Sequence, residues 1–269
     1  MKKYKILFFA LLLVCYSSAQ NIPRSYIRTK TYLKTDATAS MDNISYLDGL
    51  GRLKQNVYVK ANPANLDIID FIEYDEVGRD SVKWLPVTNN GSGAYVPDIS
   101  MISMPIYSEG NPYTKFTYDA IDRPIAETGP GSAWASHPVT YKYGLNGANE
   151  VKAFKIYGAT SDEIIYTEYY EPGTLYKKET RDEDGNPVWE YVDKDGRMVM
   201  VRYSTLNADT YYLYNPAGQL RYVLPPSAAD ALVAFNFYDL SNDAISKYTY
   251  FYQYDARGNC IQKKLPACE

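Results

Sequence analysis

Three oxygen-bearing side chains alternate in the segment from residue 181 to residue 186. Asp182, Asp184 and Asn186 stand two positions apart, and side chains of this kind can wrap a calcium ion. In the usual calcium loop, however, the glycine follows the third ligand and a glutamate closes the loop. Gly185 here precedes the third oxygen. The segment is therefore predicted to be a polar hairpin turn, with no metal or cofactor bound.

Residues that could carry catalysis are few. His137, beside Pro138, is the only histidine, and one imidazole does not indicate a Ser-His-Asp relay or a His-rich zinc site. A glycosidase needs two carboxylates held about 5–10 Å apart, and the sequence indicates no such pair. Phosphate-binding loops, dinucleotide fingerprints and nucleophile elbows are missing as well. The chain is predicted not to be an enzyme.

Cys260 and Cys268 are the candidates for a disulfide. Eight residues of straight strand would hold them ~26 Å apart, far beyond the ~7 Å limit on Cα separation for a bridge. Pro266 could supply the necessary bend. An intrachain bridge, separate thiols and pairing with residues outside this sequence all stay open. Two cysteines alone cannot complete a tetrahedral zinc site.

A recurring element, Tyr-Asp-x-x-Gly-Arg, is the dominant pattern of the chain. Residues 74–79 form the cleanest copy, residues 254–259 nearly repeat it, and residues 46–52 carry one extra residue. Weaker forms begin at Tyr118, Tyr191 and Tyr214. The predicted turn residues are Asp48, Gly51, Arg52, Tyr74, Asp75, Gly78, Arg79, Tyr118, Asp119, Asp195, Gly196, Arg197, Tyr214, Gly218, Tyr254, Asp255 and Gly258.

The chemistry of the element indicates a strand, a turn and a second strand. Upstream of the last copy, tyrosines at 248, 250, 252 and 254 alternate with other residues, which is the two-residue period of a strand. The Asp can accept backbone N–H bonds ahead of it, and the Gly permits a positive φ. Arg79 could lie over a neighbouring Tyr ring. Because there are six copies, the element is interpreted as an architectural unit rather than a catalytic site.

On these residues the chain resembles the YD repeats of the rearrangement-hotspot (Rhs) and teneurin-like proteins. The segments 26–32, 46–52, 74–79 with Trp84-Leu85-Pro86, and Gly129-Pro130-Gly131 before Trp134 resemble the domain of unknown function that precedes the repeats in Bacteroidetes Rhs-type proteins. In that family the repeats coil as a β-sheet spiral into a hollow shell around a C-terminal toxin or other cargo. The resemblance implies a non-enzymatic β-scaffold, the N-terminal segment of such a shell.

The chain departs from the full family pattern at its end. It stops soon after an apparent repeat and carries neither the repeat-associated core motif nor a variable toxin tail. We therefore expect a truncated gene, a split component or one segment of a larger shell, with cargo or toxin encoded downstream as its partner. So few strands cannot close a shell, so an exposed sheet edge is expected.

The first residues have the pattern of a secretory signal peptide. Lysines at 2, 3 and 5 precede the apolar run 6–14 and the small residues 17–19, and the run is far shorter than the ~20 residues of a membrane span. Export to the periplasm, cell surface or outside is predicted, with lipidation at Cys15 as the alternative. Cleavage after Ala19 would move the formal charge from −4 to −7, which argues against nucleic acid as a partner.

The organisation along the chain is predicted to be all-β. It comprises a signal peptide (1–19), an N-terminal β domain (20–145) and an irregular array of antiparallel hairpins (146–269), with a loop over 89–112. One or two short helices are expected, the first capped by Ser227 and the second over 241–247. With 29 tyrosines, the strands also suit a cell-surface module that recognises a glycan or a partner protein, which is the alternative function.

Overall fold

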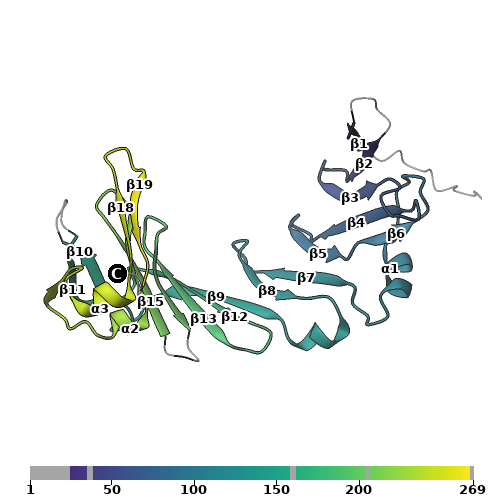
Figure 1. Ribbon diagram of the computed structural model, residues 1–269. Coiled ribbons are helices and arrows are strands. Elements are labelled where there is room, and N and C mark those ends of the chain that lie inside the picture. The colour runs from purple at the N-terminus through teal and green to yellow at the C-terminus, as the bar shows by residue number, and fades with distance from the viewer. Residues whose placement is uncertain (1–24, 35–38, 158–161, 204–205, 207, 267–269) are drawn as a thin grey trace, which may run out of the picture. The chain divides into compact units, whose positions relative to one another are not determined.

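The structure, a computed structural model, describes residues 25–34, 39–157, 162–203, 206 and 208–266 (Figure 1). The predicted signal peptide, Cys15 and Cys268 lie outside these residues. All strand pairs are antiparallel and the sheets are open. The predicted all-β class is therefore confirmed. The chain forms two compact units, Met1–Phe71 with Pro86–Pro97 and Ile72–Leu85 with Asp98–Glu269. The predicted border at residue 145 falls inside the second unit and stays a prediction.

The first unit is a small sheet with one loop fastened over it. Its strands follow the order β1 (Tyr26–Tyr32), β2 (Ser40–Leu47), β3 (Leu53–Tyr58) and the beginning of β4 (Asp67–Tyr74), and β6 (Val87–Asn89) also pairs with β4. Its buried apolar residues are Ile44, Val57, Ile69, Phe71, Val87 and Val96. Every residue of β1 is exposed, so this strand is held mainly by its pairing with β2.

Two buried polar side chains hold the loop of the first unit in place. Asp67 is 1% exposed and accepts the N–H of Lys60 at 2.9 Å and that of Gly93 at 2.6 Å. Gln55, equally buried, exchanges hydrogen bonds with the backbone of Val96. Because a buried polar group is costly unless it is hydrogen-bonded, these two residues fix where the loop lies.

The second unit contains a long ladder and a small sheet. The ladder runs through the end of β4, β5 (Asp80–Trp84), β7 (Tyr113–Tyr118), β8 (Pro124–Thr128), β9 (Val139–Leu145), β12 (Tyr176–Arg181), β13 (Pro187–Val192), β14 (Met198–Tyr203), β15 (Ala208–Tyr214), β16 (Leu220–Leu224), β18 (Tyr250–Tyr254) and β19 (Cys260–Lys264). The small sheet consists of β10 (Lys152–Ile156), β11 (Ile164–Tyr169) and β17 (Asn236–Tyr238).

The helices are short, and their positions differ from several predictions. The segment expected to be a loop contains α1 (Ser100–Ile106), and a 3₁₀ turn, η1, covers Ser132–Ser136. The residue Ser227 is not an N-cap, because α2 is Pro226–Ala229 and follows Pro225 without a side-chain cap; two prolines fix the entry instead. Within the described ranges, no helix has the length and apolar character needed to span a bilayer.

The last helix, α3 (Asp243–Tyr248), begins where the second helical turn was expected. Its N-cap is Asn242, whose side chain accepts the N–H groups of Ala244 and Ile245. Tyr248 had been predicted in a strand, but it ends the helix, and β18 starts at Tyr250. The helix continues through Tyr248 because Thr249, the residue after it, donates both its N–H and its hydroxyl to the Ile245 carbonyl.

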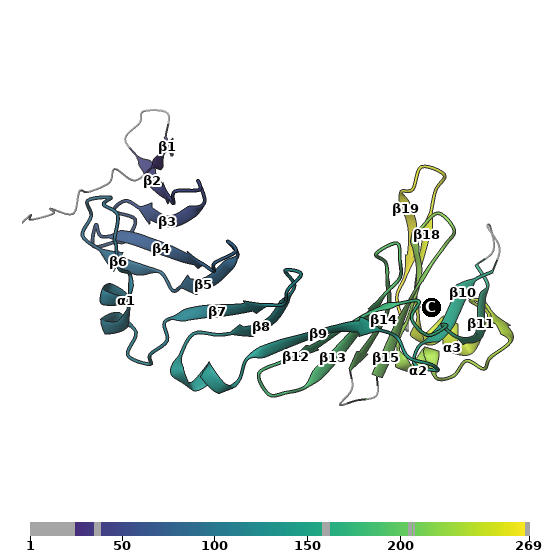
Figure 2. The same cartoon turned by 180° about the vertical axis from the view of Figure 1, so that it is seen from behind.

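The hydrophobic core of the second unit lies under the small sheet and the last two helices. Both views show α2 and α3 side by side, close to β15 (Figures 1 and 2). The core residues come from β10 to β18 and include Phe154, Tyr166, Tyr191, Met200, Tyr211, Tyr222, Leu224, Ile245 and Phe251. By contrast, β7, β8, β9 and β12 contain no buried residue. One half of the ladder therefore has a core, and the other half has none of its own.

Candidate functional site

The repeated element forms a five-residue turn with a hydrogen-bonded Asp at its start. In the cleanest copy, Asp75 Oδ1 accepts the N–H of Val77 at 3.1 Å and that of Arg79 at 2.9 Å, and Oδ2 accepts Nε of Arg79 at 2.7 Å. The Gly78 N–H donates to the Asp75 carbonyl at 3.0 Å, with φ of 96° at Gly78. This left-handed glycine closes a hairpin turn with a bulge.

The same turn recurs along both units. Equivalent N–H bonds to the first side chain occur at Asp48, Asp119, Asp182, Asp193 and Asp255, and Asn215 accepts from Gln219 N. Positive φ values occur at Gly51, Gly78, Gly185, Gly196, Gly218 and Gly258. In the copy without glycine, Asp122 takes φ of 65°, a conformation that Asp tolerates better than most residues.

One of these turns differs from the sequence interpretation, whereas the polar hairpin turn predicted over 181–186 is confirmed. In the copy at 191–197 the N–H acceptor is Asp193, whereas the predicted turn residue Asp195 lies two positions later and pairs with Arg197 at 2.9 Å. The Asp182 turn is a further copy that lacks the tyrosine. Its Asp-x-x-Gly-Asn pattern, the same as that of 255–259, was the signal that could have identified it. Both carboxylate oxygens of Asp182 accept hydrogen bonds within the turn.

The Tyr and Arg of the element join one hairpin to the next. The guanidinium of Arg79 lies 4.8 Å from the ring centroid of Tyr118. It also donates to the Asp119 carbonyl at 3.0 Å and to Asp122 Oδ1 at 2.8 Å. In return, the Tyr118 hydroxyl donates to the carbonyl of Asp80 at 2.8 Å. The Arg of one turn and the Tyr of the following turn therefore form a reciprocal contact, which we call the interlock.

The interlock recurs in whole or in part farther along the ladder. Arg123 lies 4.4 Å from the Tyr143 ring, and the Tyr143 hydroxyl donates to the Pro124 carbonyl at 2.9 Å. Arg197 lies 5.4 Å from the Tyr214 ring. In each case the Arg side chain comes from a turn and the ring comes from a later strand.

Where the turn carries Gln219 in place of Arg, the hydroxyl half of the interlock remains. The Tyr254 hydroxyl donates to the carbonyl of Leu220, the residue after Gln219, at 2.9 Å. Arg221 supplies a ring contact on the neighbouring strand, 4.7 Å from Phe251. In the copies at Tyr118 and Tyr254 the hydroxyl therefore bonds the preceding hairpin, with a cation on the ring in the first copy and without one of the repeat arginines in the second.

The electrostatics of the turns favour ionised aspartates. The N–H of Arg52 is the largest influence on Asp48, and with the Arg52 guanidinium it outweighs burial and lowers the pKa of the carboxyl. The N–H and guanidinium of Arg123 lower the pKa of Asp119 in the same way. Hydrogen bonds to the charged form are the physical cause of both shifts.

The remaining candidate residues, His137 and Cys260, lie at the surface. His137 is exposed and follows η1, its N–H donating to the Trp134 carbonyl at 2.9 Å. Cys260 begins β19 with an exposed side chain, and since Cys268 is not described, the disulfide stays a prediction. Within the described residues no group of three or more His, Cys, Asp or Glu side chains is arranged to hold a metal ion.

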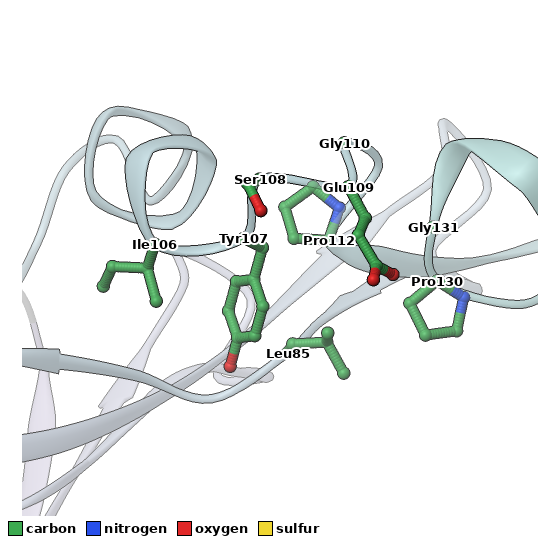
Figure 3. A pocket seen from close by; sticks show the side chains of 9 residues that line it. All are labelled: Leu85, Ile106, Tyr107, Ser108, Glu109, Gly110, Pro112, Pro130 and Gly131. Carbon is green, nitrogen blue, oxygen red and sulfur yellow. The ribbon is translucent and has the colours of Figure 1, made fainter.

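A pocket that the sequence did not indicate lies beside α1 in the second unit. Its volume is about 350 Å³, and it is lined by Leu85, Ile106, Tyr107, Ser108, Glu109, Gly110, Pro112, Pro130 and Gly131. Figure 3 shows the side chains of Leu85 and Tyr107 facing the same space, with the carboxylate of Glu109 extending toward Pro130. Its lining combines apolar side chains with the polar side chains of Ser108 and Glu109, and Glu109 is the one acidic group among them.

Comparison with known proteins gives a family match and a shared fold. Residues 20–145 match the model of a family described as a domain of unknown function, DUF6443. This is the segment for which the sequence predicted such a domain. No curated protein matches the chain significantly.

The similar solved structures share the fold of nearly the whole chain. The crystal structure of TcdB2–TccC3–Cdc42 is 17% identical over 92% of this chain, with a TM-score of 0.54. That of TcdB2–TccC3–TEV is 15% identical over 96%, also with a TM-score of 0.54. TcdB2–TccC3 without its hypervariable C-terminal region is 16% identical over 89%, with a TM-score of 0.50. At these identities the likeness concerns the fold, and the chain spans only 11–12% of the length of those proteins.

Proposed function

We propose that the chain is a non-enzymatic β-scaffold, a segment of an Rhs-like YD-repeat shell that encloses or presents a toxin or other cargo. The observation that carries this proposal is the interlock, in which the Tyr118 hydroxyl and the Arg79 guanidinium each bind the neighbouring hairpin. The Asp75 carboxylate is occupied as well, within its own turn. The Tyr, Arg and Asp side chains of the element, which could otherwise take part in catalysis, therefore have structural roles.

The coreless half of the ladder supports the same proposal. Strands β7, β8, β9 and β12 leave no residue buried, as expected of a single-layer wall with a surface on each side. The shared fold with TcdB2–TccC3 structures is consistent with a wall segment. Under this proposal the chain is exported, and its cargo is a polypeptide encoded next to it.

The experiment is a protease-protection assay on the complete product of the locus, with any polypeptide encoded beside this chain. A cargo inside a shell should resist proteolysis until the shell is opened by denaturant. Loosening the interlock by Arg79→Ala with Tyr118→Phe should expose the cargo at lower denaturant concentration. The matched control is Arg257→Ala, a change at an exposed turn residue. Equal digestion of the cargo in the intact protein and in its unfolded form would refute enclosure.

A second function, a surface binding module for glycans or a partner protein, is favoured by one feature. A cleft of about 490 Å³ in the second unit is lined by three tyrosines and several charged residues, namely Tyr170, Tyr212, Tyr214, Asp193, Asp195, Arg197 and Lys155. Aromatic faces beside polar groups suit a ligand with both kinds of surface. A glycan array probed with the chain and with Tyr212→Ala tests this: specific binding lost in the variant would favour the module.

A further inference from the structure

We propose that the pocket beside α1 binds the side chain of a lysine or arginine from an extended polypeptide segment. Leu85, Tyr107, Pro112 and Pro130 form the largely apolar part of its walls, Ser108 and Glu109 add polar groups, and Glu109 is the only charged residue in the lining (Figure 3). An aliphatic stem suits these walls, and the cation at its end suits the carboxylate and the Tyr107 ring. No other ordinary side chain combines the two features.

The carboxylate of Glu109 is available for such a ligand. In the part of the chain that the structure describes, neither a salt bridge nor a hydrogen bond engages its side-chain oxygens. Only the backbone carbonyl of Glu109 has a structural role. It accepts the N–H of Ser132 at 3.1 Å and the hydroxyl of Ser132 at 2.6 Å. A Cβ at Gly131 would lie 3.9 Å from Glu109 Oε2, so the acid lies beside the pocket wall.

The pocket is held in shape before any ligand arrives. The Gly131 N–H donates to the Asn111 carbonyl at 2.8 Å, and the Leu85 N–H donates to that of Pro112 at 2.9 Å. Asn111 itself has φ of 42°, an uncommon conformation that costs free energy and persists only when its surroundings fix it. A site that is already formed loses little entropy when it binds.

The surroundings of the pocket favour a polypeptide over a free amine. Met104 and Ile106 are each 49% exposed, and Trp134, which lies against Gly131, is 48% exposed. Residues flanking a bound lysine or arginine could cover these apolar surfaces, whereas a small amine would leave them in water. The formal net charge of −4 also favours a basic partner.

The test is a calorimetric titration of the full chain with the pentapeptide acetyl-Ala-Ala-Lys-Ala-Ala-amide and its arginine counterpart. The norleucine peptide keeps the stem without the charge, and butylamine supplies the cation without a backbone. We expect the two basic peptides to bind at least roughly fivefold more tightly than the norleucine peptide. They should also bind more tightly than butylamine, and all charge-dependent binding should weaken with added salt.

Variants of the chain locate the binding. Glu109→Gln should abolish the preference for lysine over norleucine, and Tyr107→Leu should reduce it; circular dichroism checks that both remain folded. Glu76→Gln, an exposed acid in a turn outside the pocket, is the matched control and should bind as the wild type does. Three results would overturn the proposal: no saturable binding of the basic peptides, equal binding of the norleucine peptide, or unchanged selectivity in Glu109→Gln. Butylamine binding as tightly as the peptides would overturn the assignment to a polypeptide.

Discussion

The two halves of the long ladder in the second unit are built from the same turns but stabilised differently. From β13 to β18 the strands lie on a core that contains Tyr191, Tyr211, Tyr222 and Phe251, all at most 2% exposed. From β7 to β9 no residue is buried. The repeat therefore supplies each hairpin and its link to the next one, while inserted elements such as β10, β11, α2 and α3 supply the core.

The coreless half compensates with contacts between long side chains across its faces. Lys83 lies 5.2 Å from the Phe116 ring, Lys178 lies 5.1 Å from Tyr141, and Arg123 lies 4.4 Å from Tyr143. In each pair the cation itself lies over the face of the ring, where the ring quadrupole attracts it. Each contact is worth only about 0.5–1 kcal/mol at exposed sites, so this half depends on many small contributions.

Removing one aromatic ring from each half tests directly whether the two halves are stabilised differently. Phe251→Ala deletes a core side chain and should cost about 3–5 kcal/mol of unfolding free energy because a cavity remains. Phe116→Ala removes a half-buried ring under Lys83 and should cost about 1–2 kcal/mol. Urea unfolding followed by circular dichroism measures both. Similar losses for the two variants would show that the halves do not differ in the way described.

The turns can be tested apart from the packing by adding a methyl group to two glycines. At both Gly196 and Gly144 an added Cβ would meet nothing within 4 Å. Gly196 has φ of 79° in a repeat turn, whereas Gly144 lies in β9 with no positive φ. Gly196→Ala should cost about 1–2 kcal/mol through the backbone alone, and Gly144→Ala should be near neutral or slightly stabilising. A neutral Gly196→Ala would contradict a strained left-handed turn.

The interlock can be measured by double-mutant cycles in each half. The cycle Arg79→Ala with Tyr118→Leu should give a coupling of about 0.5–1.5 kcal/mol. The cycle Arg197→Ala with Tyr214→Leu should give less, because its cation lies farther from the ring, at 5.4 Å rather than 4.8 Å. Melting or urea curves of the four proteins in each cycle supply the data. Additive effects in the first cycle would mean that the two side chains act independently.

The local features of this fold could be predicted from the sequence, whereas the contacts between distant residues could not. The aspartate bonds and the left-handed glycines follow from five residues in a row, so they could be anticipated at Asp75 and Gly78. The partner of Arg79 could not be identified, because Tyr118 is 39 positions away and its place depends on strand order. The helix α1 was not predicted because it contains Pro105 and is flanked by turn residues. The pocket beside it depends on three separate segments of the chain.

The smallest expected effect is a pH dependence that distinguishes turns with a titrating aspartate from the one built on Asn215. The bonds from Arg123 lower the pKa of Asp119, so the folded state binds fewer protons than the unfolded state. The stabilisation is therefore complete above the unfolded pKa of about 3.9 and is lost as pH falls through the lower folded value. Asn215 accepts the Gln219 N–H at 2.9 Å without titrating.

Hydrogen exchange on the two turns between pH 6 and pH 2.5, expressed as protection factors, measures this difference. Protection of the Arg123 amide should fall with acid, whereas that of Gln219 should change less, because its acceptor keeps the same charge. Asp119→Asn provides the matched control, and it should bring the pH response of the first turn to that of the second. If both amides lose protection in parallel, the acid sensitivity belongs to the whole unit, and the aspartates are not its source.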